Sequence, residues 1–272
     1  MNPGVWRWSE LAAEHGRDWP RGQVASGQLR RIGHGWYAAP AADNSVVRAV
    51  QLGGRLGCLS ACGAHGLWVP PGQDLHVTFN RRAPGSMPPG VVGHHDRELG
   101  SEPAVRPLLS ALTEVVRNHD TETALIVLDS AINRGMVTEA DVICLANECP
   151  KPKRRVLRYL DGRADSGTET RVRYFFQRRG VPVEPQVYVP SVGRVDLRVG
   201  RSLLIECDSW AHHTGEENYR KDRGRDLILI PDANRVLRLT FEQVFYQWPA
   251  TQLALIRMVR ARLHRPLPLS AR

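Results

Sequence analysis

Apolar and polar residues alternate most regularly in the second half of the chain, where they predict a β-hairpin. Residues 194–199 change character at every position, as in a half-buried strand, and residues 202–207 predict the returning strand. Side chains alternate between the two faces of a strand. A three-residue loop centred on Arg201 would therefore place Asp196 opposite Glu206.

A helical spacing of apolar residues followed by a short hairpin marks the N-terminus. Residues 8–16 predict a capped helix, residues 21–31 a second helix, and residues 32–37 a tight hairpin. Helix, helix and hairpin within residues 1–45 are typical of a winged helix-turn-helix. Such a module presents its second helix to the major groove of DNA or serves as a protein-contact module.

Helices and strands also alternate in the middle of the chain. Residues 46–150 predict an α/β region with a helix around residues 60–61, strands at 76–78 and 91–93, and helices at 108–116, 122–133 and 138–147. Residues 151–165 begin with a basic run and predict a connector, which is either a solvated linker or a helix laid along a phosphate backbone. Residues 166–272 predict the last domain, with a further strand at 236–240 and a helix at 251–263.

The composition fits a globular chain without a membrane span. The 272 residues are enough for two or three small domains, and their hydrophobic content of 42% is enough to form the cores. No apolar run reaches the roughly 18 residues that a membrane helix needs, and no secretory signal begins the chain. We therefore expect a soluble, cytoplasmic protein with no membrane partner.

The net charge of +9 is unevenly distributed. Residues 1–150 carry 13 Lys and Arg against 15 Asp and Glu. Residues 151–160 carry five bases and no acid, and residues 161–272 carry 19 bases against 13 acids. The basic excess in the second half is the pattern expected of a surface that binds a polyanion such as DNA. A generally arginine-rich proteome is the alternative explanation.

The five cysteines have no spacing that is typical of a disulfide framework or a zinc site. Cys58 and Cys62 lie one helical turn apart, and we interpret them as small core residues. His94, His95 and Asp96 are able to bind a metal, but no companion ligands lie at a regular spacing. The surface end of a strand is therefore the preferred interpretation of this trio.

Three carboxylates converge at the end of the predicted hairpin. Glu206 and Asp208 point to the same side of their strand, and Asp196 lies opposite Glu206 in the expected register. Like charges at this distance repel one another. A hard divalent cation such as Mg²⁺ or Mn²⁺ is the usual reason for such a grouping. The alternative is a solvated hairpin edge with unrelated acids.

Residues on either side of the hairpin extend it into an ordered motif. Upstream, Ser166 and Glu169 predict a capped helix start. The motif residues in chain order are Ser166, Glu169, Val195, Asp196, Glu206, Asp208, His212, Asp222, Arg225, Asp226, Leu237 and Arg238. With this set, residues 166–260 resemble the endonuclease-like family related to the very-short-patch-repair enzymes, within the PD-(D/E)XK nuclease superfamily. The resemblance implies a mixed sheet flanked by helices.

A second resemblance covers the N-terminal half. Gly33 to Tyr37 form a G-x-x-x-Y hairpin, and Ser60-Ala61, residues 65–68 and residues 76–78 follow it as a helix and a strand. These segments resemble the N-terminal domain of AbiEi-family antitoxins. Together the two resemblances cover nearly the whole chain.

The nuclease resemblance implies roles for the candidate site residues. Asp196 and Glu206 would be the primary ligands of Mg²⁺ or Mn²⁺, and Asp208 would hold a second cation or accept a proton from water. His212 would act as a general acid or base, since the pKa of histidine lies near neutrality. Glu169 would approach from the first helix.

The same resemblance implies contacts with DNA. The candidate side chains lie in the basic connector and beyond the hairpin: Lys151, Lys153, Arg154, Arg155, Arg220, Lys221, Arg223 and Arg225. Two structural alternatives remain open. Glu169 can instead be a capping residue paired with Arg173, and Arg225 or Arg238 can instead pair with a core acid.

The sequence thus predicts an α/β (α+β) protein that acts as a metal-dependent DNA endonuclease, in DNA repair or in defence against foreign DNA. Asp208 stands where the superfamily has Lys, and Ser209 where the family has Gly. These two departures keep open the alternative of a catalytically inactive DNA-binding regulator or antitoxin-like protein. An RNA nuclease is a third possibility, and the oligomeric state is not predicted.

Overall fold

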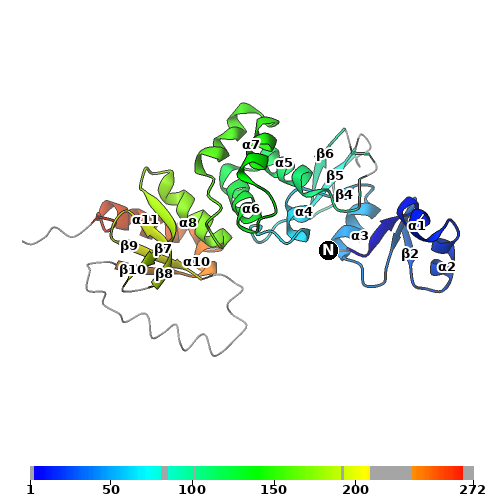
Figure 1. Ribbon diagram of the computed structural model, residues 1–272, viewed down its shortest axis with the longest axis horizontal. Coiled ribbons are helices and arrows are strands. Elements are labelled where there is room, and N and C mark those ends of the chain that lie inside the picture. The colour runs from blue at the N-terminus through cyan, green and yellow to red at the C-terminus, as the bar shows by residue number, and fades with distance from the viewer. Residues whose placement is uncertain are drawn as a thin grey trace, which may run out of the picture. The chain divides into compact units, whose positions relative to one another are not determined.

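The computed structural model describes residues 3–80, 85–97, 99–100, 102–190, 193–208 and 235–265. These residues form mixed α/β structure in which helices accompany several sheets (Figure 1). The chain divides into two compact units. Unit 1 comprises Met1–Val127 and Glu139–Arg155, and unit 2 comprises Leu128–Thr138 and Val156–Arg272. Every helix in the described part of the chain is too short or too polar to cross a bilayer.

Unit 1 begins with a small antiparallel sheet and two helices. The elements in chain order are β1 (Val5–Arg7), α1 (Trp8–His15), α2 (Trp19–Ala25), β2 (Arg30–Gly33) and β3 (Trp36–Ala38). The strands lie in the order β1-β3-β2. The predicted first helix and the hairpin are confirmed.

The predicted second helix, residues 21–31, is partly wrong. Helix α2 ends at Ala25, and Arg30 and Arg31 belong to β2 instead. Gly27 adopts a left-handed conformation with φ +75° just beyond the helix. This conformation ends helices readily at glycine, because glycine lacks the Cβ that disfavours it. The chain is then free to turn into the strand.

The rest of unit 1 is built around a second sheet. Its elements are α3 (Asn44–Gln51), β4 (Arg55–Leu56), α4 (Cys58–Ala64), β5 (Leu75–Phe79), β6 (Val91–His95), α5 (Leu108–Asn118) and α7 (Glu139–Asn147). The strands lie in the order β4-β5-β6, with β5 and β6 parallel. Apolar residues of both sheets and of α3 form one core cluster, so the N-terminal sheet is not packed separately.

Helix α6 (Thr121–Asn133) contains the boundary at which the chain passes from unit 1 to unit 2. The basic residues that were predicted to start a connector form a 3₁₀ helix, η1 (Lys151–Tyr159). Its first part is assigned to unit 1 and the remainder to unit 2.

Unit 2 contains a four-stranded mixed sheet with helices packed against it (Figure 1). The strands β7 (Val183–Val189), β8 (Gly193–Val199), β9 (Leu203–Cys207) and β10 (Arg235–Leu239) lie in the order β10-β9-β8-β7. Only β9 and β10 pair in parallel among these strands. Residues of helices α8 (Gly167–Gln177), α10 (Phe241–Phe245) and α11 (Trp248–Arg260) share one apolar core with the sheet.

The predicted hairpin is confirmed as β8 and β9. Leu197 pairs with Ile205 and Val199 with Leu203, which is the register expected for a three-residue loop centred on Arg201. Alternate residues of β9 therefore enter the core beneath the helices, where Cys207 is buried. The residues between them, Leu204 and Glu206, are left for the other face of the sheet, where Leu204 belongs to a second apolar cluster.

Candidate functional site

Asp196 lies on β8 at the end of the hairpin pairing. The pairing of β8 with β9 extends to Leu197 and Ile205, and one further step of the same register brings Asp196 opposite Glu206. The backbone N–H of Cys207 donates a hydrogen bond of 2.8 Å to Oδ2 of Asp196. This bond ties the carboxylate of Asp196 to the adjacent strand and fixes its position.

Glu169 lies in the first turn of α8. The hydroxyl of Ser166 caps the helix by accepting from the Glu169 backbone N–H, and it donates to Oε1 of Glu169 at 2.8 Å. The backbone N–H of Asp165 donates to Oε2 at 3.0 Å. Only 3% of Glu169 is exposed. The predicted cap is therefore confirmed, and it holds a buried carboxylate in place.

Gln186 connects these two acids, and sequence reasoning missed it. Its amide nitrogen donates to Oε2 of Glu169 at 2.7 Å, and its side chain also hydrogen-bonds to Asp196. The residue has a φ of +56° in the middle of β7, a conformation that non-glycine residues rarely adopt. Strained backbone of this kind is concentrated at functional sites. No pattern of polar and apolar positions signals it.

Burial changes the acidity of both carboxyl groups. It raises the pKa of Glu169 to about 7, and the neighbouring negative charge of Asp196 adds to that shift. Burial also raises the pKa of Asp196, against the backbone N–H of Cys207, which lowers it. Desolvation and like charge both disfavour the ionised form. In the described part of the chain, neither acid forms an ion pair with a basic side chain.

Other buried acids of the protein are neutralised by arginine. In unit 2, Arg173 contacts Asp129 at 2.5 Å, and both side chains are almost fully buried. In unit 1, Arg106 contacts Glu114 at 3.1 Å. Arg173 is thus the partner of Asp129 and not of Glu169, so the expected pairing of Glu169 with Arg173 is wrong, although Glu169 does lie at the cap of α8.

Glu206 and Asp208 lie near Asp196 but in a different electrostatic setting. Arg238 lies beside Glu206 on β10, with 3.6 Å between its Nε and Oε2 of Glu206. Arg238 therefore pairs with an acid, as the alternative expected, but this acid is the partly exposed Glu206 and not a core acid. Asp208 donates its backbone N–H to the carbonyl of Leu239 at 2.9 Å. Its negative charge acts to raise the pKa of Asp196.

The structure does not draw the carboxylates into a closed metal-binding set. Among the described residues, the group of ligand atoms close enough to hold an ion is in unit 1 and does not include Asp196, Glu206 or Asp208. The remaining predicted residues His212, Arg220, Lys221, Arg223 and Arg225 lie outside the described residues, as does Ser209.

Two of the basic connector residues have structural contacts. The ammonium group of Lys153 donates to the carbonyl of His119 at 2.6 Å, and the guanidinium of Arg154 donates to the carbonyls of Cys149 and Asn147. Lys151 and Arg155 are exposed on the same 3₁₀ helix. The connector is therefore not a free linker, since its basic side chains partly serve to hold it against unit 1.

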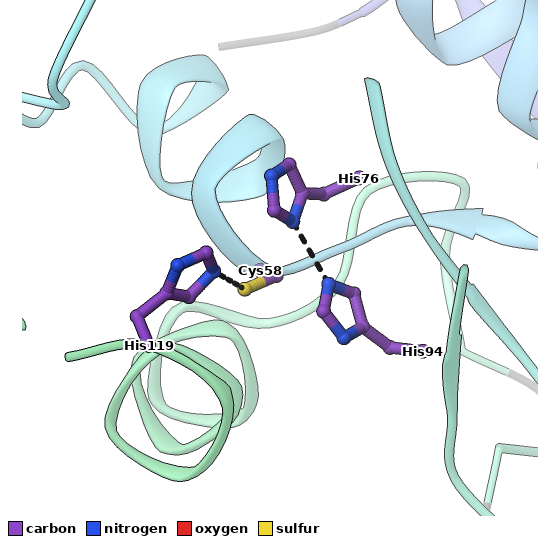
Figure 2. A group of neighbouring side chains, drawn as sticks. All are labelled: Cys58, His76, His94 and His119. Atoms are coloured by element: carbon purple, nitrogen blue, oxygen red, sulfur yellow. Dashed lines mark hydrogen bonds between the residues drawn. The ribbon is translucent and has the colours of Figure 1, made fainter. Parts of the chain in front are cut away.

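A second group of chemically active side chains lies in unit 1. Figure 2 shows Cys58, His76, His94 and His119 converging, with the ring nitrogens and the sulfur turned toward one another. One ligand atom from each residue lies within 4.8 Å of the other three. The Cys58 sulfur is 3.2 Å from Nε2 of His119, and Nδ1 of His76 is 2.8 Å from Nε2 of His94.

This group corrects two interpretations of the sequence. His94 was expected at the surface end of a strand, but β6 continues to His95 and only 9% of His94 is exposed. His95, the next residue, does point outward. Cys58 is buried as predicted, yet it contacts a histidine and is more than a small core residue. Its companions are 18, 36 and 61 residues away, at no motif spacing.

The imidazoles of this group are neutral at physiological pH. Burial lowers the pKa of His76 to about 3 and that of His94 to about 4, and it also lowers the pKa of His119. Burial raises the pKa of the Cys58 thiol to about 12. Cys58 has a φ of +47° at the start of α4, which is a strained conformation for a side-chain-bearing residue.

No protein-family model matches this chain, and no curated protein matches its sequence. The resemblances to a nuclease family and to an antitoxin domain therefore stay predictions, and the site has to be judged on its own geometry.

Proposed function

We propose that unit 2 is a PD-(D/E)XK-type domain that binds a divalent cation at Asp196 and hydrolyses phosphodiester bonds in DNA. The observation that carries this proposal is the pair of buried carboxylates, Glu169 and Asp196, which share the Gln186 amide and have no basic partner in the described residues. Elsewhere in this chain, buried acids such as Asp129 have an arginine. An uncompensated buried pair is costly and is typical of a functional site.

A hard cation fits the donor atoms that are present. Asp196, Glu169 and Glu206 offer carboxylate oxygens, and Mg²⁺ and Mn²⁺ prefer oxygen to nitrogen or sulfur. The absence of a closed carboxylate set does not oppose this assignment. Mg²⁺ is commonly held by one or two carboxylates, with water and substrate phosphate completing its coordination.

Each residue has a task that follows from its surroundings. Asp196 is the primary ligand, because the N–H of Cys207 fixes its carboxylate beside the end of β9. Glu169 has a pKa of about 7, so it can take up and release a proton at neutral pH. A bound cation would supply a more acidic water molecule and neutralise charge on the scissile phosphate.

DNA is the proposed substrate because residues 151–272 hold the basic excess of the chain. Of the basic residues predicted to contact the phosphates, Lys151 and Arg155 are exposed. The N-terminal elements α1, α2 and the β2–β3 hairpin are interpreted as a winged helix-turn-helix, which would add a second contact with DNA.

One observation favours a second candidate, a DNA-binding protein that does not cut. Glu206 is paired with Arg238, so part of the predicted ligand set is already neutralised. Asp208 occupies the position where the superfamily places Lys, which normally orients the attacking water. Such a protein would bind DNA through the same basic surface and leave it intact.

Cleavage by matched variants separates these candidates. Wild-type protein is incubated with single-stranded, duplex, mismatched and branched DNA in Mg²⁺ and in Mn²⁺. Asp196→Asn should reduce cleavage by about 10²-fold or more, because the cation loses its main ligand. Glu184→Gln, which changes an exposed acid on β7, should keep cleavage within about twofold of wild type.

Wild-type cleavage no greater than that of Asp196→Asn on every substrate would refute the nuclease proposal. Retained DNA binding in that case would establish the non-cutting alternative.

A further inference from the structure

We propose that unit 1 contains a structural zinc site formed by Cys58, His76, His94 and His119. Four ligand atoms from four separate segments of unit 1 meet there: the start of α4, β5, β6 and the end of α5 (Figure 2). Three imidazoles and one thiolate make a donor set that zinc prefers, and four protein ligands complete its tetrahedral coordination.

The distances suit a zinc ion without a large rearrangement. Zinc bonds of about 2.0–2.3 Å separate tetrahedral ligand atoms by roughly 3.3–3.8 Å. The two closest contacts, Cys58–His119 at 3.2 Å and His76–His94 at 2.8 Å, are shorter than this by a few tenths of an ångström. The other pairs lie within 4.8 Å. Small side-chain rotations are therefore sufficient to admit the ion.

The surrounding residues hold the ligands in place. The backbone N–H of Cys58 donates to Oε2 of Glu114 at 2.8 Å, and the hydroxyl of Thr78 donates to Oε1 of the same carboxylate. Arg106 neutralises Glu114 from the other side. Lys153 holds the His119 carbonyl. Contacts of this kind around the ligands commonly orient a metal site.

Gly57 shows that the approach of α4 to β5 is specific. A Cβ atom at this position would lie 2.0 Å from Oγ1 of Thr78 and 2.9 Å from Oε2 of Glu114. Glycine therefore allows the close approach that brings the next residue, Cys58, to the other three ligands. Cys58 itself has a left-handed backbone conformation. Hydrophobic packing alone does not call for a cysteine and three histidines at this point.

The proposal predicts the metal content of the full-length protein. Elemental analysis of the wild type, purified without added chelator, should find about one zinc ion per chain. Cys58→Ala should lose nearly all of it, whereas Cys62→Ala should keep it, because Cys62 is equally buried but lies outside the group. His119→Ala and His95→Ala form a second matched pair, with loss expected only for His119→Ala.

Two further readouts keep the test decisive if Cys58→Ala does not fold. His119 is only partly buried at the end of α5, so its variant tests the site with less disturbance. Removing the metal from wild type with a chelator should lower the melting temperature by about 5 °C or more. Adding Co²⁺ to the stripped protein should produce the visible bands of a tetrahedral thiolate site, absent from His119→Ala.

Wild-type protein that contains no zinc, and that takes up neither Zn²⁺ nor Co²⁺ after chelation, would overturn the proposal. Equal zinc content in Cys58→Ala and Cys62→Ala, or in His119→Ala and His95→Ala, would overturn it as well. In either case the four residues form a hydrogen-bonded cluster without metal.

Discussion

The two units of this protein differ in which side-chain atoms are able to bind a cation and in how close together these atoms lie. Unit 1 gathers one sulfur and three ring nitrogens within 4.8 Å. The described residues of unit 2 place carboxylate oxygens around Asp196 but not in such a close group. Soft donors that are already in place suit a permanent structural ion, whereas a looser set of hard donors suits an ion that arrives with substrate.

The buried acids of this protein also fall into two kinds. Asp129 and Glu114 each contact an arginine, so their charge is balanced within the fold. Among the described residues, Glu169 and Asp196 contact hydrogen-bond donors and no arginine: Gln186, the Ser166 hydroxyl and backbone N–H groups. Under the proposed function a cation balances the charge of Asp196 and Glu169, and the difference between the two kinds of buried acid can be measured.

The largest effect is expected where the paired acid loses its arginine. Arg173→Met should lower the free energy of unfolding by about 3–5 kcal/mol, because Asp129 would be left as an unpaired buried charge. Chemical denaturation of the purified variant measures this. Arg198→Met is the control, since it breaks a partly exposed pair with Glu184 and should cost less than about 1 kcal/mol. Equal losses in the two variants would contradict the contrast.

A smaller effect of opposite sign on the free energy of unfolding is expected at Glu169, which has no arginine partner in the described residues. The folded pKa of Glu169, about 7, lies above its unfolded value of 4.5. Between pH 4.5 and pH 7 the carboxyl ionises in the unfolded chain more readily than in the folded protein, so Glu169 destabilises the fold increasingly as the pH rises. Below pH 4.5 this cost vanishes, because the carboxyl is protonated in both states. Glu169→Gln removes this cost.

Denaturation curves with a chelator present test this sign. Between pH 5 and pH 8, the stability of Glu169→Gln relative to wild type should rise by about 2 kcal/mol. Glu184→Gln should show no comparable change, since Glu184 is exposed and paired with Arg198. A stability difference between Glu169→Gln and wild type that stays constant with pH would show that the pKa of Glu169 is not raised.

Local patterns in the sequence predicted the parts of unit 2 that depend on neighbouring residues. The alternation in residues 194–199 and the loop around Arg201 set the hairpin register. Ser166 was recognised as a cap because its hydroxyl satisfies a free N–H of the first turn. Glu169 was predicted to lie at the same helix start, because it follows the cap by three residues.

Features that depend on distant contacts were not predictable. Gln186 enters the site through a left-handed backbone conformation in a strand, which no spacing reveals. The Cys58 group is assembled from residues up to 61 positions apart, so its members looked like unrelated core and surface residues. The second helix was predicted to continue to Arg31, but α2 ends at Ala25 and Gly27 turns the chain toward β2.

The proposed function requires the Asp196 carboxylate to hold a divalent cation. Anomalous diffraction from crystals soaked in Mn²⁺ measures this directly, because manganese scatters anomalously and magnesium does not. A bound ion should give a peak within about 2.0–2.4 Å of a carboxylate oxygen of Asp196, with an oxygen of Glu169 or Glu206 as a neighbour. The peak should be absent from Asp196→Asn crystals. An empty position beside Asp196 in well-soaked wild-type crystals would contradict the proposed function.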